Sequence, residues 1–166
     1  MRRSHALGLV VLALAGCSSP EQRGWQPPAP FSPLHQGFQN GRLAVGADGR
    51  ALLAWTEGAH VWSASSADGV AWTAPEQVDD AASRAGLSAL ATSPSGKAAI
   101  VWRAEETTPA DHFKVRLRDP ASGWLPSNEP LDGLTSDGSG GAVAVNDAGD
   151  VVAVSARYDA SGHVWA

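Results

Sequence analysis

A turn followed by an apolar run recurs about every 50 residues, and this repeat constrains the fold of the 166-residue chain more than any other feature. Gly49, Gly96 and Gly149 stand in turn-like stretches at intervals of 47 and 53 residues. The apolar runs that follow them are ALLAW, AAIVW and VVAVS. Because each run keeps its distance from its glycine, we predict several copies of one supersecondary unit.

Two further markers repeat with nearly the same period. A tryptophan with a proline close behind it recurs at Trp25, Trp72 and Trp124, at intervals of 47 and 52 residues. A histidine ahead of an apolar run recurs at intervals of 52 and 51 residues. Trp55 and Trp102, each six residues after its glycine, hold matching places in the apolar runs and are predicted to be core residues.

Each unit consists of short extended runs separated by turn residues, a pattern typical of strands. The 18 Gly and 11 Pro also argue against a helical bundle. The expected strands are residues 43–46, 50–56, 60–65, 71–78, 88–92, 97–103, 112–118, 123–131, 142–146, 150–156 and 163–166. Four strands in about 50 residues is the size of a β-propeller blade.

We therefore predict an all-β fold of about three four-stranded antiparallel, propeller-like blades over residues 24–166. The third unit lacks a fourth strand, and residues 24–31, which resemble that strand in sequence, are expected to complete it. Propellers have about four to eight blades, so three are too few to close a ring. The chain is expected to form an open stack, to self-associate, or to be a piece of a longer protein, and its end inside the run HVWA favours the last two.

The amino terminus has the pattern of a secretion signal. Arg2 and Arg3 give a positive start, an apolar stretch covers residues 6–15, and small residues precede Cys17. The stretch is too short for a membrane-spanning helix, which needs roughly 20 residues. Residues 1–16 are predicted to be a signal peptide and residues 17–23 a polar tether.

Leu14, Ala15, Gly16 and Cys17 resemble the lipobox of bacterial lipoproteins. The resemblance implies a diacylglycerol on the Cys17 thiol, cleavage before Cys17, and acylation of the new amino terminus by a fatty acid such as palmitate. One acyl chain is marginal as an anchor, at about 0.8 kcal/mol for each buried CH2 group, whereas two or more hold firmly. Ser18 stands where an Asp is associated with retention at the inner membrane, so the expected location is the outer membrane of the cell envelope.

An ordinary secreted protein is the alternative, and it would carry Cys17 as a free thiol, which an oxidising compartment disfavours. The lone cysteine also excludes an internal disulfide scaffold. Without residues 1–16 the chain keeps 10 basic and 17 acidic residues, a formal charge of −7. We therefore predict no nucleic-acid partner and no electrostatic docking to anionic lipid, so that acylation supplies the contact with the bilayer.

The stretch SADGVAWTAP resembles the Asp box of the sialidase superfamily and related propellers, a motif that runs roughly SxDxGxTW. Ser66, Asp68, Gly69 and Trp72 carry the resemblance, although one residue is missing between the Asp and the Trp. Residues 119–124 retain less of the motif. In that family the Asp box is a structural hairpin between the third and fourth strands of a blade. The resemblance implies that Asp68 binds turn amides and that Trp72 packs beneath them.

Catalysis in those enzymes uses an arginine triad, a tyrosine with a glutamate partner, and an acidic proton donor. Tyr158, the only tyrosine, has Arg157 beside it, but nothing like the family's amino-terminal Arg-Ile-Pro signature occurs. We therefore predict that the chain is not an enzyme. A remnant of a sialidase-like glycoside hydrolase remains an alternative.

His60, His112 and His163 suggest a three-histidine metal site, since imidazole binds zinc and copper. Their equivalence in the repeats, however, places them on different blades. No metal and no other cofactor are therefore predicted.

Two carboxylate pairs, Asp79 with Asp80 and Glu105 with Glu106, have the chemistry of glycoside hydrolysis. Neighbouring residues point to opposite faces of a strand or fan out in a loop, so we predict solvated turns at both places. The Gly-rich residues 136–141 lack the lysine of a phosphate-binding loop and are predicted to be a flexible connection.

The sequence therefore predicts a membrane-anchored lipoprotein with a non-catalytic propeller-like domain that binds an envelope protein or a glycan through its loops. A truncated gene product without independent activity is a third possibility, besides the glycosidase remnant.

Overall fold

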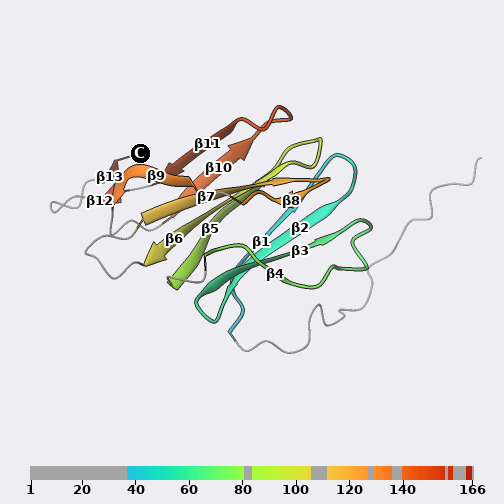
Figure 1. Ribbon diagram of the computed structural model, residues 1–166, viewed down its shortest axis with the longest axis horizontal. Helices are drawn as coiled ribbons and strands as arrows, with labels where there is room; N and C mark the ends of the chain where they lie inside the picture. The colour runs from blue at the N-terminus through green and yellow to red at the C-terminus, as the bar shows by residue number, and fades with distance from the viewer. Residues whose placement is uncertain are drawn as a thin grey trace, which may run out of the picture.

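The computed structural model describes residues 37–80, 84–105, 112–126, 129–135, 140–155, 157–158 and 164–165. Within these ranges the chain forms open antiparallel sheets and no helix (Figure 1). The prediction of an all-β fold is confirmed.

The first sheet has four strands in the order β1-β2-β3-β4. They are β1 (Gln39–Val45), β2 (Ala51–Glu57), β3 (His60–Ser66) and β4 (Glu76–Gln77). The second sheet has the order β5-β6-β7-β8, with a fifth strand, β9, also paired to β7. Its strands are β5 (Arg84–Thr92), β6 (Ala98–Glu105), β7 (His112–Asp119), β8 (Gly123–Trp124) and β9 (Glu129–Thr135).

The third sheet contains only β10 (Gly141–Val145) and β11 (Val151–Ser155). A separate pair follows it, formed by β12 (Arg157–Tyr158) and β13 (Val164–Trp165). In Figure 1 the three larger sheets follow one another from β1–β4 through β5–β9 to β10–β11.

The prediction of four strands in every unit is therefore correct only for the first sheet, and there the strand expected over residues 71–78 is reduced to β4 (Glu76–Gln77). The strand expected over residues 123–131 is divided into β8 and β9, with Pro126 between them, and proline has no amide hydrogen to continue a ladder. In the third unit β13 pairs with β12, beyond the end of β11, so β11 gains no third strand within the described residues. Residues 24–31 lie outside the described ranges.

Three hairpin turns, between β1 and β2, β5 and β6, and β10 and β11, have the same hydrogen bonds. In each turn the amide of the marker glycine, Gly49, Gly96 or Gly149, donates to the carbonyl three residues earlier at 3.0 Å. These glycines have φ angles of 80°, 83° and 96°, in the left-handed region that other residues rarely adopt. The repeated glycines thus mark three structurally equivalent turns.

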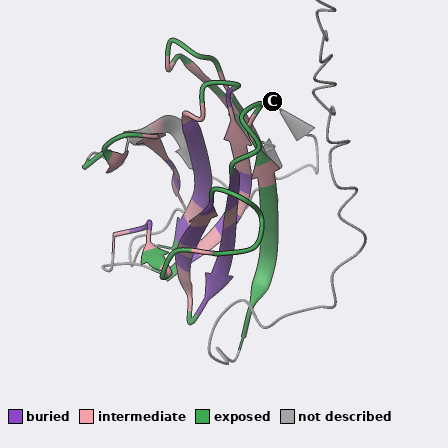
Figure 2. Ribbon diagram, turned by 90° about the vertical axis from the view of Figure 1, so that its right-hand side faces the viewer, coloured by how far each residue is buried: buried purple, intermediate pink, exposed green. Residues whose placement is uncertain are grey.

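The second sheet lies between the other two and is buried on both faces. One side of β6 packs in a cluster with Leu52 and Ala54 of the first sheet, and the other side in a cluster with Val143 and Val151 of the third. The side chains of β6 alternate between them: Ala98, Ile100, Trp102 and Ala104 on one side, Ala99 and Val101 on the other. A strand that is covered on both faces needs a continuous apolar run, which explains the sequence AAIVW. In Figure 2 the buried residues run along the central strands and the exposed residues lie in turns and at margins.

Buried hydrogen bonds join the first sheet to the second. Trp124, which is 8% exposed, donates from Nε1 to Ser63 Oγ at 2.8 Å. The amide of Leu87 donates to Thr56 Oγ1 at 2.8 Å. These bonds fix how the two sheets sit on each other, because a shifted sheet would leave buried polar groups without partners.

The loss in free energy of unfolding when a tryptophan is replaced by alanine should be larger where the tryptophan is more deeply buried. Trp55 and Trp102 are fully buried, as predicted, whereas Trp72 is only partly buried. Trp102→Ala is expected to lower the free energy of unfolding by about 3–5 kcal/mol, the usual cost of emptying a large core site. Trp72→Ala serves as the matched control and should cost clearly less. Urea unfolding followed by circular dichroism measures both, and equal losses would contradict this assignment of the core.

Candidate functional site

A cavity of about 700 Å³ opens where β1 and β5 begin and where β2 and β6 end. This is the end of the strands opposite the three glycine turns. Its lining is rich in polar side chains, among them Gln39, Asn40, Thr56, Arg84, Arg103 and Glu105. Amide, hydroxyl, guanidinium and carboxylate groups together offer both donors and acceptors of hydrogen bonds to a ligand.

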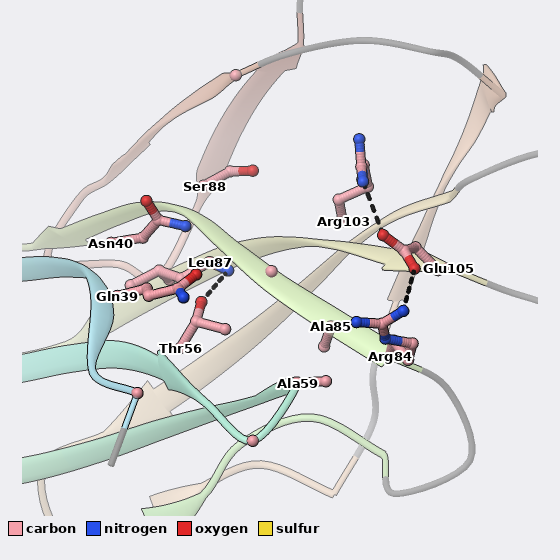
Figure 3. Close-up of a pocket in the computed structure, with 14 residues that line it drawn as sticks. Gln39, Asn40, Thr56, Ala59, Arg84, Ala85, Leu87, Ser88, Arg103 and Glu105 are labelled. Carbon is pink, nitrogen blue, oxygen red and sulfur yellow. Dashed lines mark hydrogen bonds and ion pairs between the residues drawn. The ribbon is translucent and has the colours of Figure 1, made fainter. Parts of the chain in front are cut away.

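Charge in the cavity is concentrated in one cluster of Arg84, Arg103 and Glu105. Arg103 Nη2 lies 2.8 Å from Glu105 Oε1, and Arg84 Nη1 lies 3.8 Å from Glu105 Oε2. Figure 3 shows the two guanidinium groups on either side of the carboxylate. The Arg84 side chain is 77% exposed. The cluster has two positive groups and one negative group, so it is locally cationic on a chain whose formal charge is −5.

Pairing of β5 with β6 creates this cluster. Arg84 lies opposite Glu105 in the ladder, and Arg103 lies opposite Gly86, two residues along the same side of each strand. Nothing in the linear sequence joins these arginines, and neither was predicted as a site residue. Only the register of the strands brings them together.

The backbone around the cavity is irregular. Two non-glycine residues with positive φ, Asn40 at 53° and Ala59 at 67°, both line it. The register of β1 on β2 shifts between Gln39 and Arg42. Positive φ at a residue such as alanine costs of order 1–3 kcal/mol, and such strain and strand irregularities concentrate at functional sites. The geometry of this end of the sheets therefore marks the cavity as the candidate site.

The motif that resembles an Asp box forms a turn after β3. Asp68 Oδ1 accepts hydrogen bonds from the amides of Val70 at 2.8 Å and Ala71 at 2.9 Å. The amide hydrogen bonds from Ala71 and then Val70 hold the pKa of the exposed Asp68 carboxyl below its usual value. Asp119 accepts amide hydrogen bonds in the same way, from the second and third residues after it.

The other residues of the motif belong to the same turn. Ser66 Oγ accepts the amide of Gly69 at 2.8 Å, and Gly69 has a φ of 74°. Ser66 and Trp72 form an isolated antiparallel bridge that closes the turn. The structure thus brings Ser66, Asp68, Gly69 and Trp72 together, at the opposite end of β3 from the candidate site.

The predicted lipidation site, Cys17, lies outside the described residues. Within the described part of the chain, no helix has the length and apolar character needed to cross a bilayer.

The histidines do not form a common cluster in the part of the chain that the structure describes. His60 Nδ1 lies 2.9 Å from Asp79 Oδ2, and Asp79 Oδ1 accepts the amide of Val61 at 2.9 Å. His112 begins β7 in the second sheet, and His163 is outside the described ranges. No group of three or more His, Cys, Asp or Glu that could hold a metal ion occurs among the described residues.

The prediction that Asp79 and Asp80 form a solvated turn is wrong for Asp79. Its side chain is fully buried, because it pairs with His60 and with a strand amide. Asp80 instead reaches across to Lys114 Nζ of the second sheet at 3.0 Å. The prediction of a turn is also wrong for Glu105, which ends strand β6 and lines the cavity, and Glu106 lies outside the described residues. Residues 136–139 of the Gly-rich segment also lie outside them.

No protein-family model matches the chain, and no curated protein matches its sequence.

The lowered pKa of Asp68 predicts how the stability of the turn depends on pH. A depressed pKa means that Asp68 stabilises the fold above its unfolded-state pKa of about 3.9 and loses this effect as the pH falls through the folded-state value. Asp68→Asn keeps an acceptor oxygen but cannot titrate. As the pH falls from about 5 through the range in which carboxyl groups titrate, the free energy of unfolding should therefore decrease less for the variant than for the wild type.

Thermal unfolding of both proteins over that pH range measures the difference. Asp68→Ala is the control, because it removes the acceptor and should be less stable than Asp68→Asn at neutral pH. Identical pH profiles of the wild type and Asp68→Asn would contradict the role of the carboxylate in this turn.

Proposed function

We propose that this chain is a lipid-anchored protein of the cell envelope whose propeller-like domain binds a glycan without transforming it. The polar, strained cavity between the first two sheets is the observation that carries the proposal. Sugars present many hydroxyl groups, and the amide, guanidinium and carboxylate groups around the cavity match them in hydrogen-bonding capacity.

Burial supports binding in preference to hydrolysis. The carboxylate of Asp79 is fully buried and already accepts a strand amide. Both carboxylate oxygens of Glu105 already have partners, since Oε1 lies 2.8 Å from Arg103 and Oε2 lies 3.8 Å from Arg84. The acidic groups therefore have roles in holding the fold or shaping the cavity.

The arrangement of the sheets supports a propeller-like architecture. The first, second and third sheets are packed face to face, and each begins with a hairpin of the same geometry. The first strands of the three sheets lie near one another, as the inner strands of neighbouring blades do. The Asp68 turn follows the third strand of the first sheet, as the resemblance to the Asp box implies.

The lipid anchor rests on the sequence at Cys17. Replacing Cys17 by Ser removes the thiol to which the diacylglycerol would be attached and should move the protein from the membrane to the soluble fraction. Ser19→Ala, two residues away, leaves the thiol in place and should stay in the membrane. Fractionation of cells that express the whole chain measures the partition. Unchanged partition of Cys17→Ser would exclude lipidation as the anchor.

Glycan binding should depend on the two arginines. The double variant Arg84→Gln, Arg103→Gln removes both positive groups, and a hydrogen bond to a charged group contributes about 1.5–3 kcal/mol. The affinity for a bound glycan should then fall by a factor of about ten or more. Arg50→Gln is the matched control, because Arg50 is exposed in the β1–β2 turn at the other end of the strands.

The measurement is a glycan array probed with the detergent-extracted protein, followed by titration with any glycan that binds. A blank array, or equal losses in the control and the double variant, would contradict the proposal. Hydrolysis of a fluorogenic sialoside by the same preparation would favour the glycosidase alternative.

A further inference from the structure

The third sheet leaves an apolar face in water. Val152 and Val154 of β11 are 67% and 47% exposed, although they belong to the same strand as residues that pack in the core. On that strand Val151 and Ala153 face the second sheet, so Val152 and Val154 project from the other side. Adjacent exposed valines on one sheet face are a typical mark of an interaction surface.

The repeat shows what this face is built to do. The residues three and five positions after the turn glycine are Leu52 and Ala54 in β2, Ala99 and Val101 in β6, and Val152 and Val154 in β11. In β2 they are buried against the second sheet, and in β6 they are buried against the third. The same positions of β11 are exposed only because no described sheet follows them.

The first sheet exposes part of the complementary face, although Ala51 and Trp55 of β2 on the same face are buried. Leu43 and Val45 of β1 are 62% and 60% exposed. Their ladder partners in β2 are the residues four and two positions after the turn glycine, Gly49. Val143 and Val145 of β10 likewise pair with the residues four and two positions after Gly149. Those two valines pack against the second sheet. Leu43 and Val45 of the first sheet are therefore the counterparts of Val143 and Val145, through which the third sheet packs on the second.

We propose that the third sheet of one copy of this chain packs on the first sheet of a second copy, and that this contact repeats the packing between consecutive sheets within the chain. Both halves of the contact are present on the same molecule, which is why a second copy is the occupant that fits. Such a head-to-tail contact closes into a ring if the rotation between copies allows it. Two copies would supply six stacked sheets, three from each copy with four, five and two described strands, and six is within the range of about four to eight blades in propellers. The contact requires neither the lipid nor the glycan.

Two double variants test this proposal, each placing charge on one end face. Val152→Glu with Val154→Glu changes the third sheet, and Leu43→Glu with Val45→Glu changes the first. All four side chains are exposed in the single copy, so the substitutions should leave its fold intact, which circular dichroism checks. Val70→Glu is the matched control, because Val70 is also 67% exposed but lies in the Asp68 turn and belongs to neither β1 nor β11.

Sedimentation velocity on the whole chain in mild detergent gives the mass of the assembly. The wild type and Val70→Glu are expected to have twice the mass of one chain, and each double variant the mass of one. When the two double variants are mixed, one contact between unaltered faces can form, so the mixture should regain a species of twice the mass. Neither double variant alone can form this contact, because every copy in it has the same face altered.

A monomeric wild type would overturn the proposal, and the end faces would then be covered by another segment of this chain or by a different protein. Dimers that survive both double variants, or that are lost equally in Val70→Glu, would overturn it as well. Failure of glycan binding would leave these masses unchanged, so the two proposals fail independently.

Discussion

Burial of the second sheet on both faces is the constraint on which the rest of the structure depends. The apolar residues of β6 alternate between the cluster shared with the first sheet and the cluster shared with the third. Burial of an aromatic side chain such as Trp102 removes about 150–250 Å² of surface from water, which stabilises the fold by at most roughly 4–6 kcal/mol. A hydrogen bond contributes only about 0.5–1.5 kcal/mol. Apolar burial therefore stabilises the stack, while bonds such as Trp124 to Ser63 set its alignment.

The two ends of the strands differ in regularity: one end carries the glycine turns and the other carries the cavity. At one end the glycine turns lie side by side, and the amide of Ser95 donates to Asp147 of the next turn at 2.8 Å. This hydrogen bond is the main reason that the pKa of the Asp147 carboxyl lies below its usual value. At the other end the backbone of Asn40 and Ala59 is strained and the cavity opens. Regular turns at one end allow the other end to depart from regular pairing at the site proposed for ligand binding.

The proposed anchor, ligand and partner involve different residues. Acylation would act at Cys17, the glycan would meet the arginines at the open end of the first two sheets, and a second copy would meet the outer faces of the first and third sheets. Because the residues that line the cavity differ from the exposed residues of the two sheet faces, a membrane-held assembly could bind glycan while its sheet faces are covered. The anchor is independent of sheet packing, since the acyl chains interact only with lipid.

The sequence by itself determined the strands, the glycine turns and the buried tryptophans, because turn geometry and two-sided burial each require particular residue types at a regular spacing. It also carried the Ser66 to Trp72 turn, whose hydrogen bonds are local. Tertiary structure alone decided the division of the predicted fourth strand into β8 and β9, the burial of Asp79, and the meeting of Arg84, Arg103 and Glu105. These features depend on which strands pair and in which register, and contacts between residues distant in the chain leave no periodic signal in it.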